Sequence, residues 1–188
     1  MNLIIFGPPG AGKGTQSNFL VNKYNLYQLS TGEVLRDEIK NKTALGLKIT
    51  SDMDSGSLVS DDIVGRLIEK FISNEKYKNR FIFDGYPRNL YQAKNLNILL
   101  KKYDQKISLV LKLVVSLETI KKRILERRIL EKRVDDTEET AIKRYKTYEK
   151  STEPVIEYYK KLNLLKAVDG ERSIDQINKE ISDIISFI

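Results

Sequence analysis

The sequence contains neither cysteine nor histidine among its 188 residues. The absence of cysteine excludes disulfide bonds and thiolate metal sites, and the absence of histidine removes the usual general base and the usual zinc ligand. A structural zinc site is therefore excluded on composition. Any chemistry must depend on carboxylates, lysine, arginine and backbone amides.

Long apolar runs are also missing. No window reaches the roughly 18 apolar residues that a membrane span requires, and Lys112 interrupts the most apolar stretch, LVLKLVVSL. The first residues enter an apolar run without the basic, apolar and small-residue order of a secretory signal. We therefore expect a soluble, cytoplasmic protein that does not act at a membrane. A chain of 188 residues that is 40% hydrophobic can bury one good core, so we expect a single domain over residues 1–188.

Acidic residues are fewer than basic ones, 26 against 33, which gives a net charge of +7. This excess suits a negatively charged partner, either a nucleic acid or a small phosphate ester, and the charge alone does not choose between them. Many lysines lie in mixed stretches such as EKRVDDTEETAIKRYKTYEK, which are typical of solvated helix faces with spaced ion pairs.

Short apolar segments with β-forming residues alternate with longer amphipathic segments. We expect strands at NLIIF, FIFDG, SLVLKLVV and LLKAVDG, and a helix from about Lys13 to Tyr24. Strands that are apolar on both faces and separated by helices indicate a doubly wound parallel sheet with helices on both faces, in the α/β class. Two stretches depart from this alternation. We interpret Ser30–Val59 as helices without a strand and Arg127–Asp136 as a short charged crossing, both inserted above the sheet.

The stretch GPPGAGKGT follows the first expected strand and precedes the first expected helix. Its Gly7-x-x-x-x-Gly12-Lys13 pattern is that of a phosphate-binding loop, which makes the fold of the P-loop NTPase type. Backbone N–H groups of such a loop point at phosphate oxygens, and Lys13 reaches the β and γ phosphates. Gly14 stands where a Ser or Thr normally supplies a hydroxyl to Mg²⁺, so the metal must be held in another way.

A second motif, FIFDGYPR, places Asp84 at the end of an expected strand. Ligands of open α/β sheets bind at this carboxyl edge, so Asp84 is expected beside the phosphate loop. Mg²⁺ keeps most of its waters, and Asp84 can hold it through those waters while the nucleotide phosphates supply direct ligands. Arg88 follows four residues later and is a planar donor suited to a second phosphate.

Four motifs together resemble the adenylate kinase family over nearly the whole chain: GPPGAGKGTQ, STGEVLR, DGYPRNLYQA and the series RxxxR…RxDD…R. That family also has Gly after the lysine. The resemblance implies reversible transfer of the γ-phosphoryl group of MgATP to AMP, giving two ADP. It also implies a core of residues 1–29, 60–126 and 137–188, a moving AMP-binding segment of residues 30–59 and a moving lid of residues 127–136.

The resemblance assigns roles to individual residues. The ATP phosphates would be held by Gly10, Ala11, Gly12, Lys13, Gly14 and Thr15. AMP would be bound by Thr31, Arg36, Gly56, Ser57, Leu58, Val59, Gly85, Arg88 and Gln92. Arg123 and Arg127 would face ATP, and Arg133 and Arg144 would contact the phosphates being joined, including that of AMP. Arg172 would lie near the adenine of ATP by its backbone. The catalytic set would be Lys13, Asp84, Arg88, Arg123, Arg133 and Arg144.

The repeat in the arginine-rich stretch leaves open which arginine faces ATP. RILER is followed by RILEK, so Arg128 is an alternative to Arg127, and both also fit an exposed charged helix. Arg123 and Arg127 are four residues apart and share a helix face, which favours a joint role. Only a few residues separate Arg127 from Arg133, so the lid is short. Long-lid members of the family sometimes carry four zinc ligands there, which this chain cannot supply.

Three other functions fit parts of the sequence. UMP/CMP kinases also have short lids, but they usually lack the Thr of STG and carry Asn-containing residues where Gln92 stands. Thr31 and Gln92 resemble an adenine-recognising pair, so we favour AMP. A nucleic-acid-dependent ATPase would be basic too, yet the chain has no recognisable nucleic-acid module. A nucleotide sensor without turnover is disfavoured by the full set of arginines. We expect a monomer whose partners are ATP, AMP and ADP.

Overall fold

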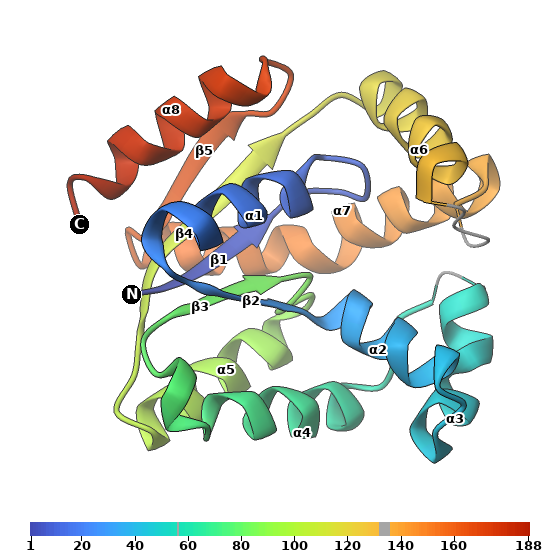
Figure 1. The fold of residues 1–188 in the computed structure, drawn as a ribbon, viewed down its shortest axis with the longest axis horizontal. Helices are drawn as coiled ribbons and strands as arrows, with labels where there is room; N and C mark the ends of the chain where they lie inside the picture. The colour runs from blue at the N-terminus through green and yellow to red at the C-terminus, as the bar shows by residue number, and fades with distance from the viewer. Residues whose placement is uncertain (56, 132–135) are drawn as a thin grey trace.

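The computed structural model describes residues 1–55, 57–131 and 136–188. Five strands form one parallel sheet in the order β2-β3-β1-β4-β5, and Figure 1 shows helices packed on both sides of it. The strands are β1 (Asn2–Phe6), β2 (Tyr27–Ser30), β3 (Phe81–Asp84), β4 (Ile107–Val114) and β5 (Leu165–Asp169). The α/β, P-loop NTPase-type fold predicted from the sequence is therefore confirmed.

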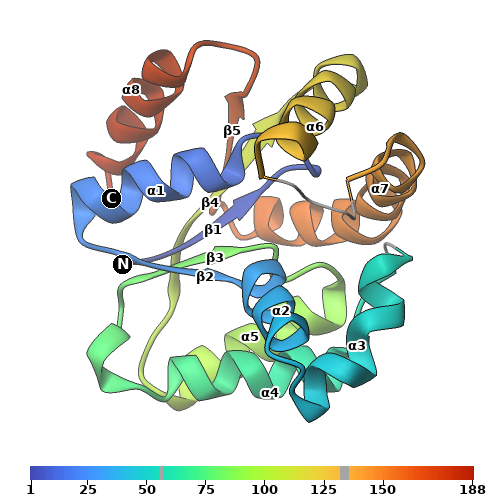
Figure 2. The same cartoon turned by 45° about the vertical axis from the view of Figure 1, so that its right-hand side comes forward.

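Within the described residues, eight helices connect or follow these strands, and some of them form the two layers that cover the sheet. They are α1 (Lys13–Tyr24), α2 (Thr31–Lys40), α3 (Ala44–Asp54), α4 (Asp61–Ile72), α5 (Leu90–Lys102), α6 (Leu117–Glu131), α7 (Glu138–Lys161) and α8 (Ile174–Ile185), with a short 3₁₀ turn at Glu75–Tyr77. In Figures 1 and 2, α1 and α8 cover one face of the sheet, and α4, α5 and the second half of α7 cover the other. No helix in the described ranges is long and apolar enough to span a membrane.

The two faces of β1 show why this sequence chooses a covered parallel sheet. Leu3 and Ile5 point into the core beneath α1 and α8, whereas Ile4 and Phe6 point into the core beneath α4, α5 and α7. Successive side chains of a strand point to opposite faces, so a strand that is apolar at every position must be covered on both sides. Burying one such side chain contributes about 1.5–3 kcal/mol.

Helices α2 and α3 form a pair that extends beyond the end of β2, as Figure 2 shows. Ser30 caps α2 by accepting a hydrogen bond from the Glu33 N–H, and Thr43 caps α3 by accepting one from the Gly46 N–H at 3.0 Å. A Cβ atom on Gly46 would lie 2.1 Å from the Glu38 carbonyl oxygen. Glycine is therefore required where the two helices meet, and the pair is closely packed.

Four expected strands are found, and the helix expected at Lys13–Tyr24 is α1. The strand β2 was missed, because YQLS is only four residues long, has one fully buried residue and lies at the sheet edge. The interpretation of Arg127–Asp136 as a charged crossing was wrong in its first half, since α6 continues through Glu131. Residues 132–135 lie outside the described ranges. The boundaries of the core, AMP-binding segment and lid stay predictions.

Candidate active site

The phosphate loop connects β1 to α1 and has a strained backbone that glycine permits. Gly10 and Gly12 have φ angles of 81° and 92°, in the left-handed region that side chains disfavour. The Ala11 N–H donates to the Pro8 carbonyl at 3.1 Å, and Gly12 precedes the first turn of α1. The loop thus places the N-terminus of a helix, with its positive end and free N–H groups, at the carboxyl edge of the sheet.

The side chain of Lys13 folds back and bonds to the start of the phosphate loop. Its Nζ donates to the carbonyl oxygens of Gly7 at 2.8 Å and Pro8 at 3.1 Å. Burial lowers the pKa of Lys13 to about 8; nearby Asp84 raises it, while Arg88 and Arg127 lower it further. The ammonium group is therefore poorly compensated and would be stabilised by an incoming anion.

Asp84 ends β3 and lies next to this loop, since β1 pairs with β3 and aligns Ile5 with Asp84. The carboxylate is only 8% exposed, and its Oδ2 accepts a hydrogen bond from Gln28 Nε2 at 3.1 Å. Gln28 belongs to β2, the strand that the sequence did not reveal. Its role as the partner that orients Asp84 was missed for the same reason.

The loop after β3 is held by its first residue, Gly85, whose φ is 75°. The Gly85 carbonyl accepts hydrogen bonds from Thr31 Oγ1 at 3.0 Å and from Arg88 Nε at 2.7 Å. Thr152 on α7 donates to the Arg88 carbonyl at 3.2 Å. Burial lowers the pKa of Arg88, with Asp84 acting in the opposite direction. Arg88 is thus a fixed, partly desolvated cation.

Gln92 follows on the first turn of α5 and is 3% exposed. Its Oε1 accepts from the Arg88 N–H at 2.7 Å, and its Nε2 donates to Asp61 Oδ1 at 2.7 Å. Asp61 comes from the first turn of α4 and was not anticipated. Gln92 faces a small cavity that is also lined by Thr31, Leu35, Met53, Ser57, Leu58, Val59, Val64, Gly85 and Arg88. This cavity combines apolar walls with one oriented amide.

Two arginines that line the same cleft as the phosphate loop share one buried carboxylate. Asp136 is 1% exposed, and it accepts from Arg127 Nε at 2.7 Å and Nη2 at 2.8 Å, and from Arg144 Nη1 at 3.3 Å. The pair with Arg127 is bidentate, which fixes the plane of the guanidinium. Asp136 was given no role from the sequence, although the acidic pair in RxDD after a run of arginines is a signal that could have found it.

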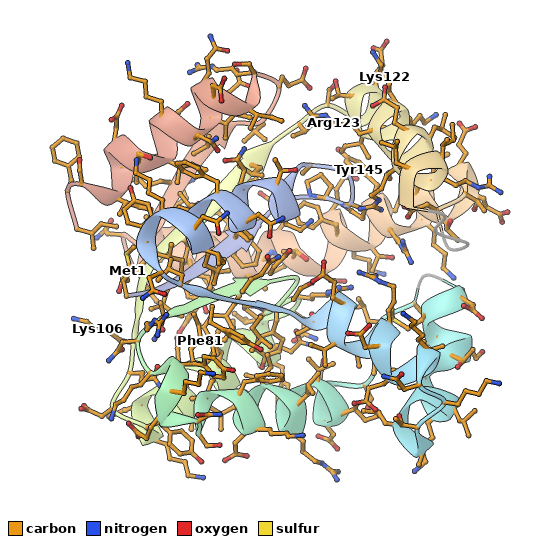
Figure 3. All side chains as sticks on the ribbon, viewed as in Figure 1. Met1, Phe81, Lys106, Lys122, Arg123 and Tyr145 are labelled. Carbon is orange, nitrogen blue, oxygen red and sulfur yellow. The ribbon has the colours of Figure 1, made fainter. Side chains whose placement is uncertain are left out.

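Arg123 and Lys122 leave α6 in different directions, as Figure 3 shows. Arg123 Nη2 donates to the Gly170 carbonyl at 3.0 Å, and its guanidinium lies near Gly12. Arg127 lines the cleft on the same helix face, whereas Arg128 is exposed and does not line it. The exposed Arg172 pairs with Asp169 at 3.2 Å and Glu180 at 3.1 Å, and its side chain does not line the cleft.

One cleft brings most of the predicted residues together. It is lined by Gly10, Gly12, Lys13, Gly14, Thr15, Arg36, Ser57, Leu58, Asp84, Gly85, Arg88, Arg123, Arg127 and Arg144. Thr31, Val59 and Gln92 line the adjoining small cavity. Ala11 belongs to the phosphate loop, and its side chain is buried in the core. Gly56 and Arg133 lie outside the described residues, so the structure does not place them.

The predicted metal-holding residue, Asp84, lines this cleft, which among the described residues is also lined by the carboxylates of Glu33 and Glu126. Within residues 1–55, 57–131 and 136–188, no three Asp, Glu, His or Cys side chains gather closely enough to cage an ion. Asp84 is a single buried, hydrogen-bonded carboxylate that lines the cleft beside the phosphate loop. This donor set fits Mg²⁺ that arrives with nucleotide phosphates and keeps its waters.

Fold and site together define a P-loop nucleotide-binding protein with two adjoining pockets in one cationic cleft. The chain matches the Adenylate kinase family over residues 5–164. It is 44% identical to an adenylate kinase of Pelagibacter ubique, with 98% of this chain and 99% of that protein covered. It is 41% identical to one of Flavobacterium psychrophilum (99% and 98% covered) and 39% identical to one of Archaeoglobus fulgidus (100% and 99% covered). The chain belongs to the adenylate kinase family, so the resemblance seen in its motifs is confirmed.

Proposed function

We propose that this chain catalyses the reversible transfer of the γ-phosphoryl group of ATP to AMP, giving two ADP, and so balances the adenine nucleotides. The observation that carries this proposal is the single cleft that joins the phosphate loop to a second cavity around Gln92. Lys13, Arg88, Arg123, Arg127 and Arg144 all line that cleft. Two nucleotides bound in the two pockets would have their phosphates among these cations.

On the ATP side, the loop residues Gly10 to Thr15 would hold the phosphates through backbone N–H groups. The Lys13 ammonium would exchange the Gly7 and Pro8 carbonyls for phosphate oxygens, which relieves its poorly compensated charge. Arg123 and Arg127 would approach from α6. The backbone around Arg172, beside the Gly170 carbonyl that Arg123 contacts, remains the proposed neighbour of the ATP adenine.

On the AMP side, Arg88 and Arg36 would bind the phosphate, and Gln92 would face the base. Thr31, Leu58, Val59 and Gly85 would enclose the nucleotide, with Ser57 at the edge of the pocket. Arg144 would meet the phosphates being joined. We keep Gly56 and Arg133 in the AMP-binding and catalytic sets as proposals, although both lie outside the described residues.

The chemistry that these residues can perform is electrostatic. Phosphoryl transfer passes through a loose transition state, which needs in-line positioning and positive charge more than a covalent partner. The AMP phosphate is an anionic nucleophile at neutral pH, so a strong general base is unnecessary. A cleft with one lysine and several arginines supplies the charge at fixed positions.

Asp84 would hold Mg²⁺ through water, and the ion would neutralise charge on the β and γ phosphates when bound. Gln28 keeps the Asp84 carboxylate oriented for this task by the hydrogen bond at 3.1 Å. No structural zinc is proposed. Closure of residues 30–59 and of the short lid, residues 127–136, would exclude the water that competes with AMP as acceptor.

We further propose that the protein works in the cytoplasm as a monomer, with ATP, AMP and ADP as its partners and neither nucleic acid nor membrane. A single experiment tests the proposed function: formation of nucleoside diphosphate from MgATP and each of AMP, UMP, CMP and GMP. We expect ADP from AMP to be formed far faster than any other product. Preferential turnover of UMP or CMP would overturn the assignment in favour of a pyrimidine nucleotide kinase, and no turnover would favour a nucleotide sensor.

A further inference from the structure

The side-chain amide of Gln92 is held on one side by a backbone N–H, which only donates, and on the other by a carboxylate, which in its ionised form only accepts. The Arg88 backbone N–H can only donate, and it donates to Gln92 Oε1 at 2.7 Å. The Asp61 carboxylate accepts from Gln92 Nε2 at 2.7 Å. A flip of the amide by 180° would place Oε1 against the Asp61 carboxylate and Nε2 against an N–H group. The network therefore fixes which end of the amide carries oxygen and which carries nitrogen.

Asp61 is itself held in place. Asn89 Nδ2 donates to both of its carboxylate oxygens, at 2.9 and 3.1 Å. Asn89 Oδ1 in turn accepts from the Gln92 N–H at 2.8 Å. These contacts join the first turns of α4 and α5, so the carboxylate faces Gln92 and the solvent-exposed neighbour Asp62 does not replace it.

An amide offers two donors and two acceptor lone pairs, and the protein uses one of each. One N–H of Nε2 and one lone pair of Oε1 remain for a ligand in the cavity. The adenine edge presents a donor at position 6 and an acceptor at N1, which match a fixed oxygen and a fixed nitrogen. A 6-oxopurine presents an acceptor at position 6 and a donor at N1, so it matches only the flipped amide.

We propose that Asp61 is a specificity-determining positioning residue: its carboxylate locks the Gln92 amide in the orientation that pairs with adenine and rejects 6-oxopurines. This inference rests on the proposed function, because it requires the base of the phosphoryl acceptor to lie at Gln92. Asp61 acts through Gln92 and need not touch the nucleotide. The same lock explains how a single amide, which can rotate freely in solution, discriminates between bases of nearly equal size.

The test compares AMP with inosine 5′-monophosphate, which differ at position 6 and N1 of the base. The measured quantity is the ratio of kcat/KM for AMP to kcat/KM for inosine monophosphate, with MgATP as donor. In Asp61→Asn, the new side chain can donate to a flipped Gln92 oxygen, so only the Arg88 N–H still opposes the flip. We expect the ratio to fall by about tenfold or more. Asp61→Ser offers a hydroxyl that can donate or accept, and the ratio should fall there too.

Two controls separate positioning from a general structural role. Asp62→Asn removes the same charge from the same helix turn and should leave the ratio unchanged, whereas Asp61→Glu keeps a carboxylate and should retain most of the discrimination. The ratio compares two substrates on one preparation, so it does not depend on the fraction of folded molecules. An unchanged ratio in both Asp61→Asn and Asp61→Ser overturns the inference. A wild-type protein that does not phosphorylate AMP instead overturns the proposed function.

Discussion

The phosphate loop and the loop from Gly85 to Gln92 lie at the same edge of the sheet but are held in opposite ways. The phosphate loop is stabilised locally, since Lys13 bonds to carbonyls only five and six residues away. The second loop has local bonds from Arg88 to Gly85 and Gln92, but it is also tied to distant residues: Thr31 bonds across 54 positions, Asp61 across 31 and Thr152 across 64. One pocket is thus formed by a local motif, and the other by the tertiary fold.

This difference has a mechanical consequence. The partners of the second loop belong to α2, α4 and α7, so any displacement of these helices changes the acceptor pocket. The hydrogen bonds of the phosphate loop stay within the loop and the start of α1, although Gly7 also packs against Leu113 of β4 and Gly10 against Ile120 and Ile124 of α6. We therefore expect the donor nucleotide to meet a preformed site and the acceptor nucleotide to meet a site that responds to movement of residues 30–59.

The largest expected effect on activity comes from Lys13→Met, a substitution in the phosphate loop. The substitution removes the charge that would lie at the transferred phosphate and leaves both cores untouched, so we expect the rate of ADP formation to fall by about 10² to 10³. Thermal unfolding should occur close to the wild-type temperature. A variant that keeps more than about a tenth of the wild-type rate would contradict the placement of ATP at this loop.

Arg88→Ala tests whether ATP and AMP bind in two distinct pockets. We expect AMP to bind about a hundredfold more weakly and ATP to bind as in the wild type, because Arg88 would contact only the acceptor phosphate. Titration calorimetry with each nucleotide measures both quantities. Equal weakening of ATP and AMP binding would mean that the cleft does not contain two distinct sites.

The same contrast explains what the sequence could predict. The phosphate loop was readable because its glycines and lysine act within a few residues, and the strands around it were readable because they are apolar on both faces. Gln28 and Asp61 were not readable, whereas Asp136 had a local signal, the acidic pair in RxDD, that was given no role. Gln28 and Asp61 each act through a partner on a distant element, at Asp84 and Gln92, and no local pattern records such pairings.

Asp136→Asn would loosen Arg127 and Arg144, which line the cleft. The neutral side chain cannot accept from Arg127 and Arg144 as strongly, so Arg127 would lose its bidentate ion pair and Arg144 would keep a weaker contact. We expect kcat to fall by about tenfold, with the AMP dissociation constant changed less. The matched control is Glu138→Gln, whose exposed ion pair with Lys121 at 3.2 Å should contribute little. If both substitutions lowered kcat equally, the result would contradict a positioning role for Asp136.

The smallest expected effect is a proton taken up when ATP binds. The pKa of Lys13 is about 8, so at pH 8.5 most molecules of the free protein have a neutral lysine. Phosphate charge raises that pKa, and binding should therefore take up as much as about three quarters of a proton at pH 8.5 and almost none at pH 6.5. Binding enthalpies measured in buffers of different ionisation enthalpy give this number. Equal uptake at both pH values would assign it to another group.

The central claim is that one cleft holds two nucleotides with their phosphates between Lys13 and Arg88. The most direct measurement is calorimetric titration with two adenosines joined by five phosphates, in parallel with ATP and with AMP. Linking makes the second binding event intramolecular, so the account predicts an affinity at least about a hundredfold above that of either nucleotide, with one ligand bound per chain. A linked ligand that binds no more tightly than ATP, or that binds two per chain, would contradict it.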